Sequence, residues 1–427
     1  MSATRVRVGL LGCGNVGGAL AEVLLADRER IARRTGTDLE LRAVAVRDIA
    51  RPRPAALPAD LLTLDAGAVV SDPGVDLVVE VMGGIEPARS LVLAALGAGK
   101  PVVTANKELL ASCGAELWGA AARAGRDLLF EAAVAGGVPL IRPLRESLAG
   151  ERIRRVLGIV NGTTNYILSG MAESGATYAE ALAEAQHLGL AEADPTADVE
   201  GFDAAAKAAI IANVAFGAGV VAGEVDREGI ASIGPDDITA ARRLGFAIKL
   251  LAVVEEIDGA IAARVHPAMV PLTHPLASVR GSFNAVFVEG ATVGDLMFLG
   301  RGAGGAPSAS AVLGDLLDAA HNLSVGGSGR TPALAALPRR PIEDLVGAYY
   351  LTLDVVDRPG VLHAVSGVLG AHSVSVRSME QEGADEGARL VFVTHPACER
   401  DVQACLRELH GLDAVRRIGG LIRVVDQ

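Results

Sequence analysis

The sequence predicts an α/β protein built from a Rossmann-type doubly wound parallel sheet, an inserted α+β domain, and a C-terminal βαββαβ domain. Three observations support this. Short apolar runs alternate with helical patterns over the first 150 residues, longer helices follow to about residue 325, and six short elements fill the last 80. At 427 residues the chain is also too long for a single compact core.

Composition excludes several classes of protein. Half the residues are hydrophobic, which fits a folded chain, while a net charge of −12 and 3% aromatic residues argue against nucleic-acid binding. No apolar run of membrane-spanning length lacks glycines or charge, and the N-terminus has no signal-peptide pattern. We therefore expect a protein that binds no membrane. A cytoplasmic location is also expected, because four cysteines lack disulfide or metal spacing: Cys13, Cys113, Cys398 and Cys405.

The first domain is predicted over residues 1–150. Its near-continuous apolar strands are typical of a parallel sheet covered on both faces. We expect a helix from about Val16, further helices at 86–98 and 108–124, and a helix near 305–325 that completes the domain. The predicted strands are 5–12, 39–48, 75–84, 100–107 and 126–134.

Two further domains and a linker follow. The inserted α+β domain, 151–304, is predicted to contain a strand at 152–160 and helices at 163–190, 203–216 and 236–257. A Gly/Pro-rich linker, 326–346, precedes the last domain, 347–427. That domain has the split βαβ order, with strands at 348–357, 374–382, 388–395 and 414–425 and helices at 360–371 and 399–409.

A glycine-rich turn follows the first strand and opens a helix. In "GCGNVG", Gly12, Gly14 and Gly17 have the G-x-G-x-x-G spacing, which lets a pyrophosphate approach the backbone at the positive end of the helix. A turn used only for tight strand-to-helix packing is the alternative. After the second strand, Arg47 favours NADP, but the adjacent Asp48 leaves NAD open.

The end of the fourth strand, "VVTANKELL", contains Thr104, Asn106 and Lys107. Ligands of open α/β sheets bind at the carboxyl ends of strands, so Lys107 is expected to point at the cofactor crevice. The alternative is a solvated lysine at the start of a helix, although the helix dipole disfavours a cation there.

Two more segments combine polar residues with apolar surroundings. Glu131 of "FEAAVAGGVPLI" would be costly to bury unless a cation or a helix end satisfies it, and both readings stay open. In "IVNGTTNYIL", Asn161, Thr163 and Thr164 cap a helix, hold a carboxylate at its free N–H groups, or do both. His274 is assigned to the core or to the neighbourhood of the substrate, without a choice between them.

The segment "AEADPTADVEGFDAAAK" gathers charges in the middle of a hydrophobic chain. Asp203 and Lys207 are four residues apart and share one face of a helix. An exposed ion pair would contribute little, but this helix has almost no polar face, so we expect Lys207 to be buried. A desolvated lysine can act as a proton donor or acceptor near neutral pH. The preceding loop offers Glu192 for an ammonium group, or for ordinary capping.

At this point the motifs resemble those of homoserine dehydrogenases over about residues 5–325. The tail, with "LTLDVVDRPGVLHAVSGVL", resembles an ACT domain. No stretch similar to an aspartate kinase precedes residue 1, so the monofunctional form is expected. The motifs that support the resemblance are "GCGNVGG", "TANK", "FEAAVAGGVPLI", "NGTTNYIL", "AEADPTADVEGFDAAAK" and "GRGAGGAPSASAV".

The resemblance implies reversible NAD(P)-dependent reduction of L-aspartate 4-semialdehyde to L-homoserine in threonine and methionine biosynthesis. It implies that Lys207, held by Asp203, transfers the proton, with Lys107 as the second choice. Glu192, Gly162 and Thr163 would contact the substrate, and Asp203 and Lys207 would lie at its hydroxyl or aldehyde oxygen. The inserted domain would serve substrate binding and dimerisation. The implied dinucleotide site consists of Gly12, Gly14, Asn15, Val16, Gly17, Arg47, Thr104 and Lys107, with Gly302 and Ala303 closing over it.

The resemblance also implies a cation, an effector and an assembly. Glu131, with the carbonyls of Val134, Gly136 and Val138, resembles the family's sodium site. In the turn "DRPGVL", Asp357 and Gly360 are expected to bind an amino acid, with threonine as the end product; a purely structural dimerisation domain is the alternative. A homodimer or homotetramer is expected.

Two rival functions stay open from the sequence. One is another amino-acid-linked NAD(P) dehydrogenase on the same scaffold; aspartate-semialdehyde dehydrogenase would need a nucleophilic cysteine, and none lies in a suitable loop. The other is a non-enzymatic sensor of amino acids and dinucleotides. The combination of Asp203, Lys207 and Lys107 argues against the sensor, since a relic need not keep all three.

Overall fold

The computed structural model describes residues 3–53, 57–331, 333–384 and 387–425 and divides into two compact units. The first unit comprises Met1–Gly162, Asp203–Val225 and Phe283–Leu337, and the second comprises Thr163–Phe202, Asp226–Ser282 and Pro338–Gln427. The functional boundaries drawn from the sequence stay predictions. Pro332 of the predicted linker lies outside the described residues.

A six-stranded sheet in the order β3-β2-β1-β4-β5-β6 forms the base of the first unit. Every neighbouring pair is parallel, and the chain turns from one side of β1 to the other between β3 and β4, which is the topological switch point of a doubly wound fold. The predicted fold class is confirmed. The strands are β1 (Thr4–Leu11), β2 (Thr37–Ala45), β3 (Leu62–Thr63), β4 (Leu77–Glu80), β5 (Val102–Thr104) and β6 (Leu128–Leu129).

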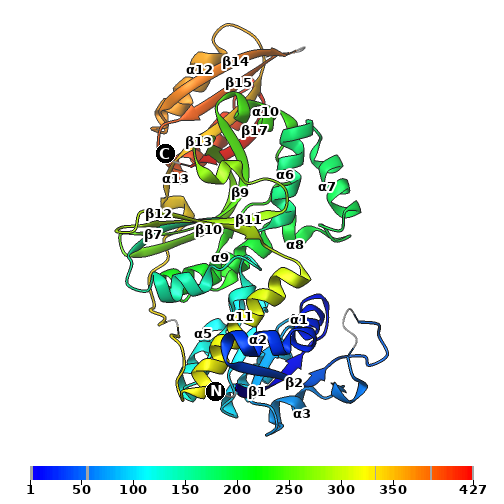
Figure 1. Cartoon of the computed structure of the whole chain (residues 1–427). Helices are drawn as coiled ribbons and strands as arrows, with labels where there is room; N and C mark the ends of the chain where they lie inside the picture. Colours follow the sequence, from blue (N-terminus) through cyan, green and yellow to red (C-terminus); the bar gives the residue numbers. More distant parts are fainter. Residues whose placement is uncertain (1–2, 54–56, 332, 385–386, 426–427) are drawn as a thin grey trace. The chain divides into compact units, whose positions relative to one another are not determined.

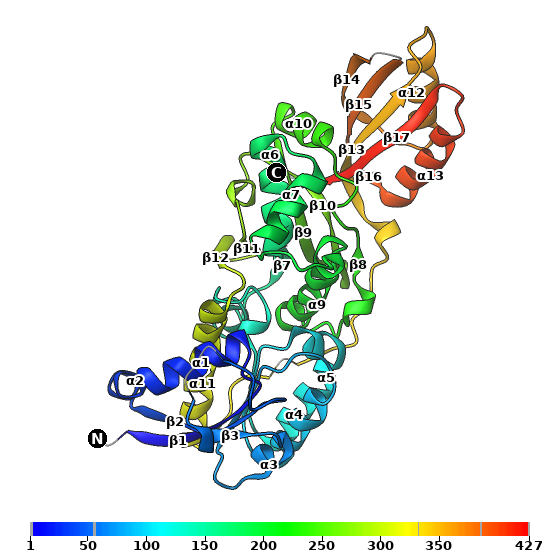
Figure 2. The same ribbon diagram turned by 90° about the vertical axis from the view of Figure 1, so that its right-hand side faces the viewer.

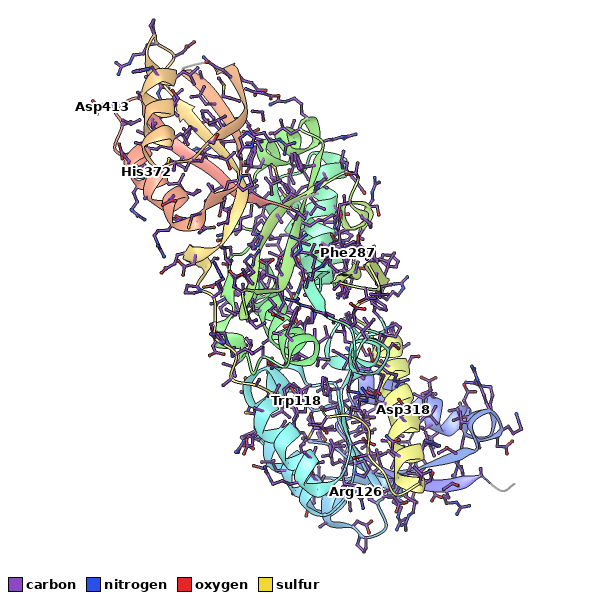
Figure 3. All side chains as sticks on the ribbon, turned by 90° about the vertical axis from the view of Figure 1, so that its left-hand side faces the viewer. Trp118, Arg126, Phe287, Asp318, His372 and Asp413 are labelled. Atoms are coloured by element: carbon purple, nitrogen blue, oxygen red, sulfur yellow. The ribbon has the colours of Figure 1, made fainter. Side chains whose placement is uncertain are left out.

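Helices from both ends of the first unit's sequence pack on this sheet. The late helix α11 (Gly305–Ser324) lies beside α1 and adds Val312 and Leu316 to the apolar core beneath the strands (Figure 1). Trp118, labelled in Figure 3, packs against Phe130 with ring centroids 5.7 Å apart. The other helices are α1 (Asn15–Ala26), α2 (Arg28–Thr35), α3 (Ala66–Ser71), α4 (Ala88–Gly97) and α5 (Lys107–Ala124).

The remainder of the first unit consists of α9 (Phe202–Phe216), which begins at its border, and three antiparallel strands in the order β12-β11-β7. The apolar stretch around α9 is a buried helix, as predicted. Among the described residues, no helix is long and apolar enough to cross a membrane. The strands are β7 (Ile153–Ile159), β11 (Phe283–Gly290) and β12 (Asp295–Arg301).

Two helix predictions in the second unit were wrong. The segment 163–190 is two helices, α6 (Gly162–Ser174, whose first residue lies in the first unit) and α7 (Tyr178–His187), because Thr177 and Glu180 form a capping box that starts a new helix. The segment 236–257 is a helix only as α10 (Pro235–Arg243). Gly245, with φ of 84°, ends it, and β9 (Phe246–Ile257) follows.

The physical reason for the second error is that β9 is buried along most of its length. A continuous apolar run looks the same in a buried strand and in a buried helix. β9 forms a long antiparallel hairpin with β10 (Ala260–Pro271). The short elements α8 (Thr196–Val199) and β8 (Asp226–Arg227) complete this part of the second unit.

The C-terminal βαββαβ order is confirmed, as the antiparallel sheet β17-β13-β15-β14. Figure 2 shows α12 and α13 covering one face of this sheet, where Leu351, Leu353 and Phe392 form the core. β17 also pairs in parallel with β10, so this sheet continues into the hairpin. The elements are β13 (Val346–Val355), α12 (Val361–Ala371), β14 (Val376–Ala384), β15 (Gly387–Thr394), β16 (Ala397–Cys398), α13 (Glu399–His410) and β17 (Val415–Val424).

The role of α11 in the core can be tested by cavity formation. Leu316→Ala is expected to lower the free energy of unfolding by about 2 to 5 kcal/mol, because Leu316 is fully buried in the core of the first unit. Leu25→Ala, on the exposed side of α1, is the matched control and should change stability by about 0.5 kcal/mol or less. Urea unfolding followed by circular dichroism measures both; equal losses would contradict the assignment of α11 to this core.

Candidate active site

A buried ion pair on α9 is the centre of the site. The Lys207 ammonium donates to Asp203 Oδ2 at 2.7 Å and to the carbonyl oxygen of Val160, at the end of β7, at 2.6 Å. Lys207 is 8% exposed and Asp203 is 7% exposed. The predicted burial of Lys207 is confirmed, and the exposed i,i+4 pair is excluded.

The same carboxylate binds a second lysine. Lys107, at the first position of α5, contacts Asp203 Oδ1 through its ammonium group, and Asn161 donates to Oδ2 at 2.9 Å. The Lys107 side chain is 40% exposed, whereas that of Asp203 is 5% exposed. The start of α5, the end of β7 and the first turn of α9 therefore meet at one carboxylate, which is shared by two cations.

The electrostatics of this cluster favour the charged form of Asp203. Burial alone would raise the pKa of Asp203, but the charges of Lys207 and Lys107 and their hydrogen bonds outweigh it and hold that pKa well below its usual range. Two ammonium groups and one carboxylate leave a net positive charge in a largely buried place. Such a site can stabilise negative charge that develops on a substrate oxygen.

The glycine turn has the shape needed for a dinucleotide. Gly12 has φ of 97°, and a Cβ on it would lie 2.7 Å from the carbonyl oxygen of Val81. A Cβ on Gly17 would lie 2.2 Å from the Gly12 carbonyl oxygen, whereas one on Gly14 would meet nothing within 4 Å. Gly14 also begins α1 without a side-chain cap. The packing glycines and the open glycine therefore fit a pyrophosphate at this helix end.

The charged residues of the loop after β2 differ in their contacts. Arg47 is exposed, whereas the Asp48 carboxylate accepts the backbone N–H of Ala50 at 2.8 Å. The Arg53 guanidinium donates to the backbone carbonyls of this loop, including that of Ile49 at 2.8 Å. Its charge also reaches Cys13 in the glycine turn, where burial raises the thiol pKa and Arg53 opposes the rise.

Glu80, at the end of β4, is a buried carboxylate that the sequence reasoning missed. It accepts the Thr104 hydroxyl at 2.6 Å and the backbone N–H of Met82 at 2.8 Å, and burial raises its pKa. The available signal was an acid inside the apolar run "VDLVVEVMGG", the same signal that drew attention to Glu131. Thr104 is thus engaged inside the sheet edge, and Asn106 caps α5 at the N–H of Leu109.

The "GRGAGG" loop packs beside the glycine turn. A Cβ on Gly305 would lie 2.7 Å from the carbonyl oxygen of Asn15, and one on Gly136 would lie 2.3 Å from that of Gly302. A Cβ on Gly302 would collide with Asn284. The loop from Gly302 through Ala303 to Gly305 therefore runs between the glycine turn and the "AVAGGV" segment, with no room for larger residues at these three glycines.

Hydrogen bonds to a helix end account for Glu131. Its carboxylate accepts the backbone N–H groups of Leu140, Ile141 and Arg142 at 2.5 to 2.8 Å. Among the described residues, no group of three His, Cys, Asp or Glu side chains could hold a metal ion. The sequence left open a cation or a helix end as the partner of Glu131, and the described contacts are those of a helix end.

In the second unit, the start of α6 is tied to the acidic turn. The Thr163 hydroxyl donates to the carbonyl oxygen of Leu190 at 2.7 Å, two residues before the exposed Glu192. In the same turn, Asp194 Oδ1 accepts the N–H of Thr196 at 3.1 Å, at the first residue of α8. His274 likewise begins a short 3₁₀ turn, accepting the N–H of Leu276 at its Nδ1.

The lysines of this chain are few and mostly buried. Of the 39 lysines and arginines only four are lysines, Lys100, Lys107, Lys207 and Lys249, and all except Lys107 are less than a tenth exposed. In the second unit, Lys249 on β9 donates to Asn165 Oδ1 at 3.1 Å and to the carbonyl oxygen of Val279 at 2.5 Å. It thereby holds the first turn of α6.

A doubly wound sheet with an open glycine turn and a buried lysine–carboxylate cluster at its carboxyl edge fits the class of nicotinamide-dinucleotide-dependent oxidoreductases. Matches to protein-family models identify the family within this class. The model "Homoserine dehydrogenase, NAD binding domain" matches residues 12–131, "Homoserine dehydrogenase" matches 139–317, and "ACT domain" matches 349–414. The chain belongs to the homoserine dehydrogenase family.

Relatives support this over nearly the whole chain. Homoserine dehydrogenases of Corynebacterium glutamicum and Mycobacterium tuberculosis are each 50% identical, covering 98% of this chain and 95% and 97% of their own lengths. A homoserine dehydrogenase structure from Thiobacillus denitrificans has a TM-score of 0.94 at 41% identity, covering both chains fully. A hyperthermophilic archaeal homoserine dehydrogenase solved with NADPH has a TM-score of 0.62 at 29% identity, covering 74% of this chain and 98% of its own.

The buried position of Lys249 is expected to make the stability of the protein depend on pH. Burial, followed by the charge of Arg280, lowers the pKa of Lys249 from 10.5 to about 8. Between these values the unfolded chain binds more protons than the folded chain, so this group makes stability rise with pH across that window.

We expect the free energy of unfolding of the wild type, relative to Lys249→Met, to increase by up to about 3 kcal/mol between pH 7 and pH 10. Urea unfolding of both proteins at several pH values measures the difference. A constant difference across the window would show that Lys249 does not change its protonation on unfolding.

Proposed function

We propose that the cluster of Asp203, Lys207 and Lys107 performs the proton transfer and charge stabilisation in the interconversion of L-aspartate 4-semialdehyde and L-homoserine. The observation that supports this is the single buried carboxylate shared by two lysines, one buried and one partly exposed. This arrangement holds two ammonium groups side by side without uncompensated repulsion.

The two lysines have different tasks in this proposal. When bound, the nicotinamide supplies or accepts the hydride at the substrate carbon. As negative charge develops on the aldehyde oxygen, both ammonium groups stabilise it and one of them donates a proton. Lys207 is the proposed proton donor, because Asp203 and the Val160 carbonyl hold its ammonium group in a buried place, whereas Lys107 is partly exposed and supplies the second positive charge. Asp203 and Asn161 keep the two groups in position.

Substrate recognition is proposed for the turn and helix start described in the second unit. Glu192 binds the substrate ammonium group as a counter-ion, and Gly162 and Thr163 contact the substrate. The hydrogen bond from Thr163 to Leu190 supports this role, because it fixes the helix start to the turn that contains Glu192.

NADP is the proposed preferred cofactor, held by the glycine turn with Arg47 near the 2′-phosphate. The exposed position of Arg47 supports this, as does the engagement of the Asp48 carboxylate with Ala50, which makes Asp48 a weaker partner for a ribose hydroxyl. The archaeal relative solved with NADPH is consistent with it. A higher kcat/KM with NADPH than with NADH is the expected result.

A sodium ion is proposed at the Glu131 turn, held by Glu131 and the carbonyls of Val134, Gly136 and Val138. The carboxylate accepts three N–H groups, and a carboxylate offers about four acceptor positions. Ala135 and Gly136 both have positive φ, which is uncommon for alanine and supports a constrained backbone there. Hard cations are bound by such oxygen ligands.

We also propose feedback control by threonine, bound by the ACT domain at the turn that includes Asp357 and Gly360. Gly360 has φ of 92° at the start of α12, a conformation that suits glycine and leaves the backbone open to a ligand. A homodimer or homotetramer and a cytoplasmic location belong to the same proposal; the four cysteines, all free, are consistent with that location.

Lysine variants test the catalytic assignment. Lys207→Ala is expected to lower kcat by about 100-fold or more, the scale of a lost general acid. Lys207→Arg should be equally impaired, because a guanidinium does not give up its proton in proteins. Lys107→Arg should recover part of the loss seen in Lys107→Ala, because it keeps the positive charge. The assay follows absorbance at 340 nm with homoserine and NADP or NAD in turn.

Lys100→Ala is the matched control, because Lys100 is a buried lysine of the first unit whose ammonium binds the carbonyl oxygen of Asp72 instead. It should keep the wild-type kcat. A folded Lys207→Ala variant with wild-type kcat would refute the assignment. Activity in Lys207→Arg together with inactivity in Lys107→Arg would exchange the roles of the two lysines.

Threonine titration tests the proposed control. L-threonine is expected to lower the rate of homoserine oxidation and to raise the melting temperature, since a ligand that binds the folded state stabilises it. D-threonine is the control and should do neither. Unchanged rate and unchanged melting temperature over the whole titration with L-threonine would rule the proposal out.

A further inference from the structure

A polar cavity of about 530 Å³ lies between α10 and the C-terminal sheet, inside the second unit. Its size is within the range of small-molecule sites. It is distinct from the turn at Asp357 and Gly360, neither of which lines it. The residues that contribute its charges are Asp236, Asp237, Arg243, Glu382, Arg389 and Arg417.

Strand alternation explains why this face of the sheet is polar. Successive side chains of a strand point to opposite faces. On β13, Leu351 and Leu353 belong to the core under α12 and α13, whereas Tyr350 and Thr352 line the cavity. Figure 2 shows α12 and α13 on one side of the sheet and α10 on the other. Tyr350 and Thr352 are both buried, so α10 covers a face that is not apolar.

Two glycines keep the cavity open. Gly419 and Gly420 lie on β17 where its pairing with β13 shifts register. A Cβ on Gly419 would lie 2.2 Å from Thr352 Oγ1, and one on Gly420 would lie 2.7 Å from Asp237 Oδ1. Neither glycine has positive φ, so they are required for space rather than for backbone shape. Such irregularities in strands often occur beside binding sites.

Asp237 is a buried carboxylate without a strong partner. It is 8% exposed, accepts the N–H of Gly234 at 3.0 Å, and receives the Tyr350 hydroxyl only at 3.4 Å. Among the described residues, no cationic group lies within ion-pair distance of it, whereas its neighbour Asp236 pairs with Arg389. A buried carboxylate is costly unless it is paired, so a cationic group in the cavity would relieve that cost.

The arginines supply the opposite charge. Arg389 and Arg417 share one acid, Asp354, at 2.7 and 2.9 Å. Arg417 is 66% exposed, and in the described contacts only its Nε is engaged, although a guanidinium has five N–H donors. Three acidic and three basic residues line the cavity, which favours a zwitterion over a simple anion or cation.

We propose that this cavity binds a free α-amino acid with a short polar side chain, its ammonium group on Asp237 and its carboxylate on Arg417 and Arg389. The hydroxyls of Thr239 and Thr352 would meet the side chain. The inference rests on the proposed amino-acid control and places a binding site for it between the sheet and α10. An occupant there touches the helix that leads directly into β9, whose Lys249 holds the first turn of α6.

Calorimetric titration of the full chain with L-threonine and L-serine tests the site. The wild type should bind, and Asp237→Asn should weaken binding by about tenfold or more while kcat is unchanged, because Asn still accepts the Gly234 N–H but offers no charge. N-acetyl-threonine and threonine amide, each lacking one charge, should not bind. Gly420→Ala, which fills the cavity, is the second variant and should also lose binding.

Asp413→Asn, which changes an exposed acid of the same unit outside both the cavity and the turn, is the matched control and should still bind. Three results would each overturn the proposed site. They are wild-type affinity in both Asp237→Asn and Gly420→Ala, equal binding of N-acetyl-threonine, and no binding of either amino acid to the wild type. Threonine inhibition that is lost in Asp357→Asn and kept in Asp237→Asn would leave the proposed control standing and remove this site. Binding that depends on Asp237 but has no effect on activity would support this site and contradict the proposed control.

Discussion

One buried carboxylate organises the reactive part of this molecule. Asp203 accepts from Lys207 of α9, from Lys107 of α5 and from Asn161 in the loop after β7. Without that negative charge two ammonium groups would face one another in a largely buried place, and an unpaired buried charge costs several kcal/mol. The position of the start of α5 relative to α9 therefore depends on Asp203 as much as the chemistry does.

Lysine and arginine have different places in this protein. Arginines form nearly all the described surface ion pairs, whereas Lys100, Lys207 and Lys249 are buried and each donates to a backbone carbonyl. A lysine ammonium is a compact group that can lose its proton when it is buried, whereas a guanidinium stays charged in proteins. Lys249 belongs to this group although no motif drew attention to it.

The second unit joins two sheets by backbone pairing. β17 pairs with β10, so the ACT sheet and the β9–β10 hairpin are continuous within the unit. Ion pairs between α10 and the ACT sheet, such as Arg243 with Glu380 at 2.7 Å, lie around the polar cavity. A change in the ACT sheet is thereby connected by hydrogen bonds and charges to the strand that supports α6.

The sequence by itself determined the glycine turn, the parallel sheet, the order of the last six elements and the buried Asp203–Lys207 pair. Each depends on local spacing: a strand before G-x-G-x-x-G, or two charges four residues apart on an apolar helix. Only the tertiary structure decided that 246–257 is a strand, because apolar runs buried on all sides have no period that distinguishes strand from helix. It also brought Lys107 to Asp203 across 96 residues and Glu80 to Thr104 across 24, since side chains that meet through folding leave no pattern in the chain.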